Sequence, residues 1–187
     1  MHFKFIFIAL ICSSLAACSG NRSKNTQASE TAPDIEKTLK KADLLAAVPF
    51  RKLPLTDSTN FDNFDDKEAL SKELIKKLHL KDIEPDYENF YSRYRLAFSD
   101  GIDAVAITMA IENEMKTYLV TYRKEDYQVI DKLQIAYDEI AESMSRTESK
   151  LTVKEIEVRE QNYWSEMPEL TIKKYCIEKS GKFTLVN

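Results

Sequence analysis

Glycine is scarce in this 187-residue chain, which contains only Gly20, Gly101 and Gly181. Because these glycines are far apart, the chain has no glycine-rich phosphate loop and no dinucleotide-binding turn. Histidine is equally scarce, with His2 close to the start and His79 alone in the remainder. A single histidine excludes a multi-histidine zinc site and makes a Ser-His-Asp triad hard to build. We therefore expect no metal and no cofactor.

Long hydrophobic runs are also absent. The longest opens the chain, where Lys4 precedes the unbroken apolar run from Phe5 to Ile11. This run falls within the ~7–15 residues of the hydrophobic region of a signal peptide. A membrane-spanning helix would need about 20 apolar residues. The pattern therefore predicts a signal peptide that is removed, rather than a transmembrane anchor.

The residues Leu15-Ala16-Ala17-Cys18 follow this run. The stretch resembles the lipobox of bacterial lipoproteins, a family in which the cysteine is acylated and becomes the first mature residue. The resemblance implies that residues 1–17 are cleaved and that Cys18 carries a diacylglycerol and a further acyl chain such as palmitate. Two or more acyl chains hold a protein at a membrane. An ordinary secretory signal, with Cys18 left as a free thiol, is the alternative.

The residue after the lipobox bears on location. Position 19 is Ser rather than Asp, which by resemblance to the family's sorting signal implies the outer membrane. The expected location is therefore the cell envelope, lipid-anchored, with the periplasmic and surface faces both open. The membrane itself is the first expected partner, through the acyl chains.

Disulfides are excluded by the cysteine count. The chain has Cys12, Cys18 and Cys176, and after cleavage and acylation only Cys176 would keep a free thiol. The hydrophobic core must then supply the stability of an exported domain without a covalent link. Cys176 lies in an alternating run and is expected to act as a small buried hydrophobe.

Charge of one sign does not dominate the sequence. The chain has 27 basic and 31 acidic residues, a net charge of −4, and the two signs are mixed throughout. Nucleic-acid binding selects for clustered Lys and Arg. We therefore expect no nucleic-acid partner.

Composition divides the chain into three parts. Residues 1–17 form the lipoprotein signal peptide, and residues 18–33 form the acylated N-terminus and a polar tether. As a flexible coil, the fifteen residues Ser19–Pro33 would span about 20 Å root mean square. The remaining residues, 34–187, are expected to form a single globular domain.

Two helical patterns open this domain. Residues 34–48 place apolar side chains near one helical face, with Asp34 as a possible N-cap. Residues 60–80 combine a capping box, formed by Asp65 and Glu68, with apolar residues at helical spacing. The apolar residues of this second pattern are Leu70, Leu74, Ile75 and Leu78.

Strand patterns follow. Residues 86–98 are ambiguous, and we expect helix or irregular structure up to Ser92 and a strand after it. In 102–111, alternation places Val105, Ile107, Met109 and Ile111 on one face, and 127–137 aligns Val129, Leu133, Ile135 and Tyr137. The run 150–159 changes phase midway, which predicts a β-bulge or a strong bend. The expected strands lie in 93–98, 102–111, 116–123, 127–137, 150–159, 169–178 and 182–186.

Short connections between these strands imply antiparallel neighbours. The predicted fold class is therefore α+β, with two N-terminal helices packed on an antiparallel meander sheet of about seven strands. In the stretches KTYLVTYRKEDYQVIDKLQIAYD and YCIEKSGKFTLV the pattern resembles that of many small, uncharacterised lipid-anchored envelope proteins of Gram-negative bacteria. That resemblance implies no particular activity.

Three groups of residues are candidates for a functional site. The loop QNYWSEMP contains Tyr163, Trp164 and Met167, and exposed aromatic side chains often anchor recognition; alternatively, Trp164 folds back over the core. The acidic residues Asp57, Asp62, Asp65 and Asp66 lack the alternating ligands and central glycine of a calcium loop. Glu155 and Glu157 share a strand face, but no second carboxylate across a cleft is identifiable.

The predicted function is that of a non-catalytic, lipid-anchored envelope protein that binds a protein, a peptide or a glycan. We expect no catalytic residues, a lipidation site at Cys18, and a binding site at Tyr163, Trp164 and Met167. Two alternatives remain, a carboxylate-dependent glycan-active hydrolase and a passive structural lipoprotein.

Overall fold

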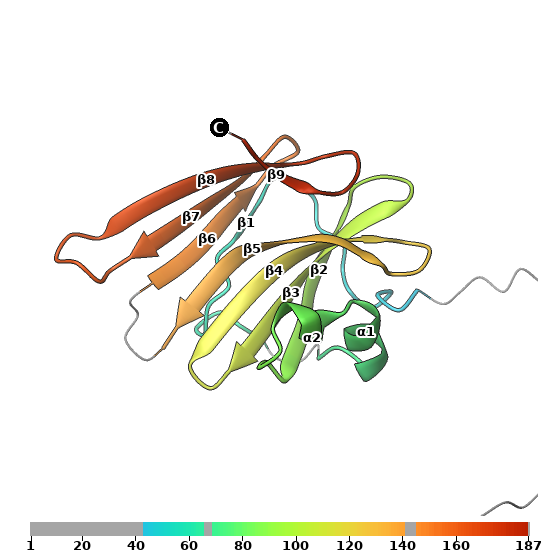
Figure 1. Cartoon of the computed structure of the whole chain (residues 1–187), viewed down its shortest axis with the longest axis horizontal. Helices are drawn as coiled ribbons and strands as arrows, with labels where there is room; N and C mark the ends of the chain where they lie inside the picture. The colour runs from blue at the N-terminus through green and yellow to red at the C-terminus, as the bar shows by residue number, and fades with distance from the viewer. Residues whose placement is uncertain (1–42, 66–68, 141–144, 187) are drawn as a thin grey trace, which may run out of the picture. The chain divides into compact units, whose positions relative to one another are not determined.

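A computed structural model describes residues 43–65, 69–140 and 145–186 (Figure 1). These residues belong to a compact unit that extends from Lys41 to Asn187. Neither helix in the described ranges is long and apolar enough to cross a bilayer. Cys18 and the tether lie outside the described residues.

The described residues form nine strands and two short helices. They are β1 (Leu55–Asp57), α1 (Lys72–Lys77), α2 (Leu80–Ile83), β2 (Asn89–Ala97), β3 (Ile102–Ile111), β4 (Glu114–Arg123), β5 (Val129–Glu139), β6 (Ser145–Leu151), β7 (Ile156–Asn162), β8 (Glu169–Ile177) and β9 (Phe183–Val186).

All nine strands belong to one antiparallel sheet. Strands β2 to β9 follow one another across it in sequence order, as the short connections predict, and β1 pairs with β6 out of order. The contact between β5 and β6 is limited, because their register contains only Tyr137 opposite Thr147. Further along the same edge of β6, β1 takes over, with Leu55 opposite Leu151. Strand β1 therefore fills the gap where β5 and β6 diverge (Figure 1).

Two hydrophobic clusters lie on opposite faces of this sheet. In β3, Val105 and Ile107 belong to the first cluster, and the alternate residues Ala104 and Ala106 belong to the second. The first cluster also contains side chains from residues 43–48 and from the segment that includes α1 and α2. Every strand has a side chain that belongs to the second cluster or packs against it, from Leu55 in β1 to Phe183 in β9. One sheet face can meet a common cluster in this way only if the sheet curves around it.

The predicted fold class is wrong. The described part of the chain is mainly an antiparallel sheet of nine strands with two short helices, rather than two N-terminal helices packed on about seven strands. Of the first predicted helix, residues 34–42 lie outside the described residues and residues 44–47 form turns. Of the second, only α1 is helical, and α2 follows as a separate short element.

Tertiary pairing explains the shortened helix. Ala69 forms a bridge with Tyr91 of β2, and the Leu70 amide donates to the carbonyl of Phe90 at 2.8 Å. These contacts hold the residues before α1 in an extended conformation. The N-cap is consequently Ser71, whose side chain accepts from the Leu74 amide, instead of the predicted Asp65. Glu68 of the predicted capping box lies outside the described residues.

The helix ends early as well. His79 adopts a left-handed conformation with φ of 49°, which separates α1 from α2. A left-handed residue cannot continue a right-handed helix. The side chain of His79 is exposed, as expected for a residue at a solvated helix end.

Strand predictions succeeded where alternation is regular. The predicted stripe on β3 is confirmed, since Val105, Ile107 and Met109 are buried in the first cluster and Ile111 packs against it. Strand β2 begins at Asn89, earlier than predicted. The aromatic residues of this segment fall at helical spacing because the strand has a register shift between Ser92 and Tyr94. Such a bulge moves the following side chains to the opposite face.

Two further strand predictions are wrong for related reasons. The phase change in 150–159 marks a hairpin turn between two strands, whereas the prediction was one strand with a β-bulge or a strong bend. Leu151 ends β6, Ile156 begins β7, and both pack in the second cluster. In β5, Val129 packs against the first cluster while Ile135 lies in the second, so the predicted single face does not form. Register shifts between β4 and β5 account for the change of face.

Candidate functional site

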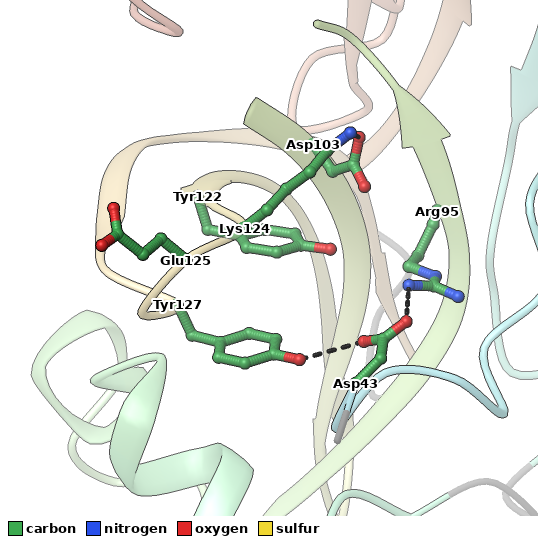
Figure 2. Close-up of a pocket in the computed structure, with 7 residues that line it drawn as sticks. All are labelled: Asp43, Arg95, Asp103, Tyr122, Lys124, Glu125 and Tyr127. Carbon is green, nitrogen blue, oxygen red and sulfur yellow. Dashed lines mark hydrogen bonds and ion pairs between the residues drawn. The ribbon is translucent and has the colours of Figure 1, made fainter. Parts of the chain in front are cut away.

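The first candidate site is a cavity of about 280 Å³ beside the first described residues (Figure 2). Strands β2, β3 and β4 and the turn after β4 supply most of its lining. Acidic side chains, basic side chains and two phenol rings meet there, so the cavity is a candidate for a catalytic site. Its lining residues are Asp43, Arg95, Asp103, Tyr122, Lys124, Glu125 and Tyr127.

The two tyrosines form the apolar wall of this cavity. Tyr122 lies in β4, and Tyr127 lies in the following turn with φ of 64°. Their rings stack with centroids 5.7 Å apart and an interplanar angle of 10°. This stacking, together with burial in the first cluster, fixes the two hydroxyls beside the charged residues.

Asp43 accepts hydrogen bonds from two side chains in the cavity. Arg95 Nη1 donates to its Oδ2 at 2.7 Å, and the Tyr127 hydroxyl donates to its Oδ1 at 3.0 Å, as Figure 2 shows. Burial alone would raise the pKa of Asp43, but the hydrogen bonds from Arg95, the Leu45 amide and Tyr127 together lower it. The same pairing raises the pKa of Arg95 against the opposing effect of its own burial. Both groups are therefore held in their charged forms.

Arg95 also binds the backbone of the preceding segment. Its Nε donates to the Val48 carbonyl at 3.1 Å, and its amide donates to the Pro49 carbonyl at 2.8 Å. The carbonyl of Arg95 accepts from the Arg51 amide at 2.9 Å. The Phe50 ring lies 4.2 Å from the guanidinium carbon, a distance typical of cation–π contact. Arg95 thus fastens residues 43–51 to β2.

The remaining charged pair in the cavity is Asp103 with Lys124. Asp103 is only 4% exposed, and Lys124 Nζ lies 3.1 Å from its Oδ1. Burial, followed by the Asp103 charge, raises the pKa of Tyr122, while Arg95 opposes that effect. A phenol of raised pKa stays protonated at neutral pH. The described contacts make this cavity a structural clasp, and the pKa of Asp43 is lowered, the opposite of what a general acid needs.

Three of the acidic candidates, Asp57, Glu155 and Glu157, are engaged in other contacts. Asp57 accepts from Tyr94 and from both the amide and the hydroxyl of Thr59. Lys174 lies 3.0 Å from Glu155 and 3.5 Å from Glu157. Within the ranges 43–65, 69–140 and 145–186, no group of three His, Cys, Asp or Glu side chains could hold a metal ion. Asp66 lies outside the described residues.

The predicted binding loop connects β7 to β8. Trp164 is 69% exposed, Met167 80% and Tyr163 42%. The Tyr163 hydroxyl donates to Gln161 at 2.6 Å, and the Trp164 amide donates to Asn162 Oδ1 at 2.9 Å. The loop backbone is therefore ordered while its large side chains point to solvent. Trp164 does not fold back over the core.

Similarity to known proteins does not assign either site. Comparisons with protein families, curated proteins and solved structures found no match.

Two further apolar side chains, close to the loop in the chain, are also exposed. Leu170 and Ile172 of β8 are 55% and 48% exposed and lie on one face of the strand. Sequence alternation pairs them on a face but does not say which face meets the core. Here the core uses the alternate residues Tyr175 and Ile177, so Leu170 and Ile172 face solvent. We call the set Tyr163, Trp164, Met167, Leu170 and Ile172 the hairpin patch.

Proposed function

We propose that this chain is a non-catalytic, lipid-anchored cell-envelope protein that binds a partner protein through the hairpin patch. The observation that carries the proposal is the exposure of Trp164 and Met167 at the tip of the β7–β8 hairpin. Large apolar side chains grouped on a surface and not used by the core mark interaction sites. A hairpin within a sheet also presents them at little cost in conformational entropy.

The composition of the patch favours a protein over a glycan. Trp, Tyr and Met are enriched at protein interfaces, and Met adapts to irregular apolar surfaces. Leu170 and Ile172 extend the patch with aliphatic surface, which packs against apolar side chains better than against sugar hydroxyls. Trp164 is the expected hot spot, since Trp truncations are among the most costly at interfaces.

The lipobox supports the anchored part of the proposal. Acylation at Cys18 would hold the domain at a membrane, and the polar tether would let the hairpin patch reach a partner in the envelope. Labelling cells with a palmitate analogue tests this point. The full chain should be labelled and its Cys18→Ser variant should not; equal labelling of both would refute acylation at this residue.

Photocrosslinking tests the binding site directly. A photoreactive residue at position 164 of the full chain should give a discrete crosslinked band in intact cells. The control is position 153, because Val153 is 85% exposed in the turn between β6 and β7 and belongs to no apolar group. The same bands from both positions, or none from position 164, would contradict the proposal.

Substitution then tests the energetics. Trp164→Ala should remove the band obtained from a photoreactive residue at position 167, and Val153→Ala should leave it unchanged. The expected loss of affinity is at least about tenfold, corresponding to the ~2 kcal/mol of an interface hot spot. Retention of the band in Trp164→Ala would show that the patch is not the binding surface.

The alternatives are less well supported. A hydrolase of the glycosidase type needs a carboxyl whose pKa is raised so that it can donate a proton. The shifts found for Asp43 and Glu114 are downward, because their hydrogen bonds outweigh burial. A passive structural lipoprotein would have no need of the exposed hairpin patch.

A further inference from the structure

Among the described residues, only half of the outer edge of β8 is covered. Strand β9 pairs with Lys174–Ile177, and the register begins with Lys174 opposite Val186. Along Glu169–Lys173 no described strand pairs with this edge, and Figure 1 shows this part of β8 running beyond β9. An uncovered edge presents backbone N–H and C=O groups to which another strand can add.

The residues whose backbone faces this edge follow from alternation. The Glu178 amide donates to the Lys182 carbonyl across the β8–β9 hairpin at 2.8 Å. In an antiparallel sheet, successive residues direct their backbone groups to opposite neighbours. Leu170 and Ile172 therefore direct their N–H and C=O groups to the uncovered edge, and Thr171 directs its groups to β7.

We propose that a second copy of this chain adds antiparallel to this edge, on a two-fold axis that passes beside Thr171. Leu170 of one copy then lies opposite Ile172 of the other, and each such pair exchanges two backbone hydrogen bonds. The two-fold axis repeats the pair, which gives four hydrogen bonds. Thr171 faces its own counterpart as a non-hydrogen-bonded pair, in agreement with the direction of its backbone groups.

The side chains are complementary in this register. The uncovered stretch reads Glu169-Leu-Thr-Ile-Lys173, so its charges are opposite in sign and equidistant from Thr171. Glu169 of each copy lies opposite Lys173 of the other, and oppositely charged cross-strand pairs are favourable. Leu170 and Ile172 of both copies meet on the other face. The interface is thus the same patch used twice, as two-fold symmetry requires.

The in-chain partner of Lys173 leaves room for this pairing. Lys173 Nζ lies 2.9 Å from both carboxylate oxygens of Glu160. An ammonium has three donors, so the third remains for Glu169 of the second copy. Edges protected from pairing often carry Lys, whereas this edge carries charges of both signs.

The ends of the uncovered stretch set the register. Pro168 precedes it and has no N–H to donate, and Val186 of β9 bounds it on the other side. A shift of the second copy toward Lys174 would bring it against Val186. In the proposed register the position opposite Lys174 is held by Val186, so each copy leaves the edge of the other at Pro168. This register also joins the two hairpin patches through Leu170 and Ile172.

Cysteine crosslinking tests the register. The suitable protein starts at Ser19, contains the whole compact unit, and carries Cys176→Ser. Non-hydrogen-bonded pairs have Cα atoms about 4.5 Å apart, within disulfide range, so Thr171→Cys should form a covalent dimer under mild oxidation. Glu169→Cys is the control, because its two copies would be more than about 12 Å apart. No dimer from folded Thr171→Cys, or equal crosslinking of both variants, would overturn the proposal.

Charge exchange provides a second measurement. Glu169→Lys and Lys173→Glu each place like charges opposite one another in the self-dimer, which should raise its dissociation constant at least about tenfold in sedimentation. An equimolar mixture of the two restores both opposite-charge pairs and should dimerise. Circular dichroism checks that each variant is folded. A folded mixture that remains monomeric at concentrations where the unsubstituted protein dimerises would overturn the pairing.

Discussion

The Tyr94 hydroxyl donates a 2.7 Å hydrogen bond to Asp57, joining β2 to β1 inside the molecule. Both residues are buried, with Asp57 4% and Tyr94 6% exposed. Burial and the adjacent Asp57 charge both raise the pKa of Tyr94, so the phenol remains a donor across the physiological range. This bond secures the strand that fills the gap between β5 and β6.

Tyr94→Phe should lower the free energy of unfolding by about 1–3 kcal/mol, because it leaves a buried carboxylate with one donor fewer. Urea denaturation measures the change. The matched control is Tyr163→Phe, which removes a hydrogen bond at the surface and should change stability by less than about 0.5 kcal/mol. Equal effects would show that the Tyr94 bond does not stabilise β1.

Asp43→Asn should reduce stability at neutral pH by about 1 kcal/mol, a modest value because the Asp43 side chain is 47% exposed. A carboxyl whose pKa is lower in the folded state contributes stability above its unfolded-state pKa of about 3.9. That contribution is lost as pH falls through the folded-state pKa. Thermal unfolding measured from pH 7 into acid should therefore show the gap between the two proteins narrowing as pH falls below about 4; a gap that does not narrow in acid would contradict the ion pair as its cause.

Gly181→Ala should destabilise the protein by about 1–3 kcal/mol, because Gly181 has φ of +88° and an added Cβ would lie 3.0 Å from Ile130 Cδ1. Its carbonyl also accepts from Thr121 at 2.7 Å, which limits relaxation of the backbone. Gly101→Ala is the control, since a Cβ there meets nothing within 4 Å. The melting temperatures of the two variants should differ clearly, and similar values would refute the steric argument.

Trp164→Ala should leave stability within about 0.5 kcal/mol of the unsubstituted protein, because its side chain lies in solvent. Leu151→Ala, at a position 1% exposed in the second cluster, should cost about 2–5 kcal/mol. Chemical denaturation of both variants measures the two losses of stability and distinguishes the surface position from the core position. A large loss in Trp164→Ala would mean that the side chain covers the core instead of awaiting a partner.

The alternation of apolar and polar residues correctly predicted the strands in which each face keeps the same environment along its whole length. In β3 alternation is unbroken, and its stripe was assigned correctly. Prediction failed where the chain changes face, at the bulge between Ser92 and Tyr94 and at the register shifts of β5. It failed again before α1, because pairing of Ala69 with Tyr91 overrides a helical spacing that is favourable in isolation.

The candidate cavity could not be predicted from sequence. Asp43, Arg95 and Tyr127 are far apart in the chain, and each taken alone is typical of a partly solvated position. Only the fold brings them together. The loop with Trp164 was recognisable because a single tryptophan in a polar segment is a local signal. Its extension to Leu170 was not, since alternation cannot distinguish the face that the core uses.

The position of β1 has a consequence for how the molecule is made. Every other pairing in the sheet joins strands that are neighbours in the chain, so those hairpins can assemble locally and quickly. Strand β1 can pair only once β6 has been synthesised, although Leu55 is made long before Leu151. The pairing of this short segment is therefore the least local one in the sheet, and until it forms the sheet keeps an open seam where β5 and β6 diverge.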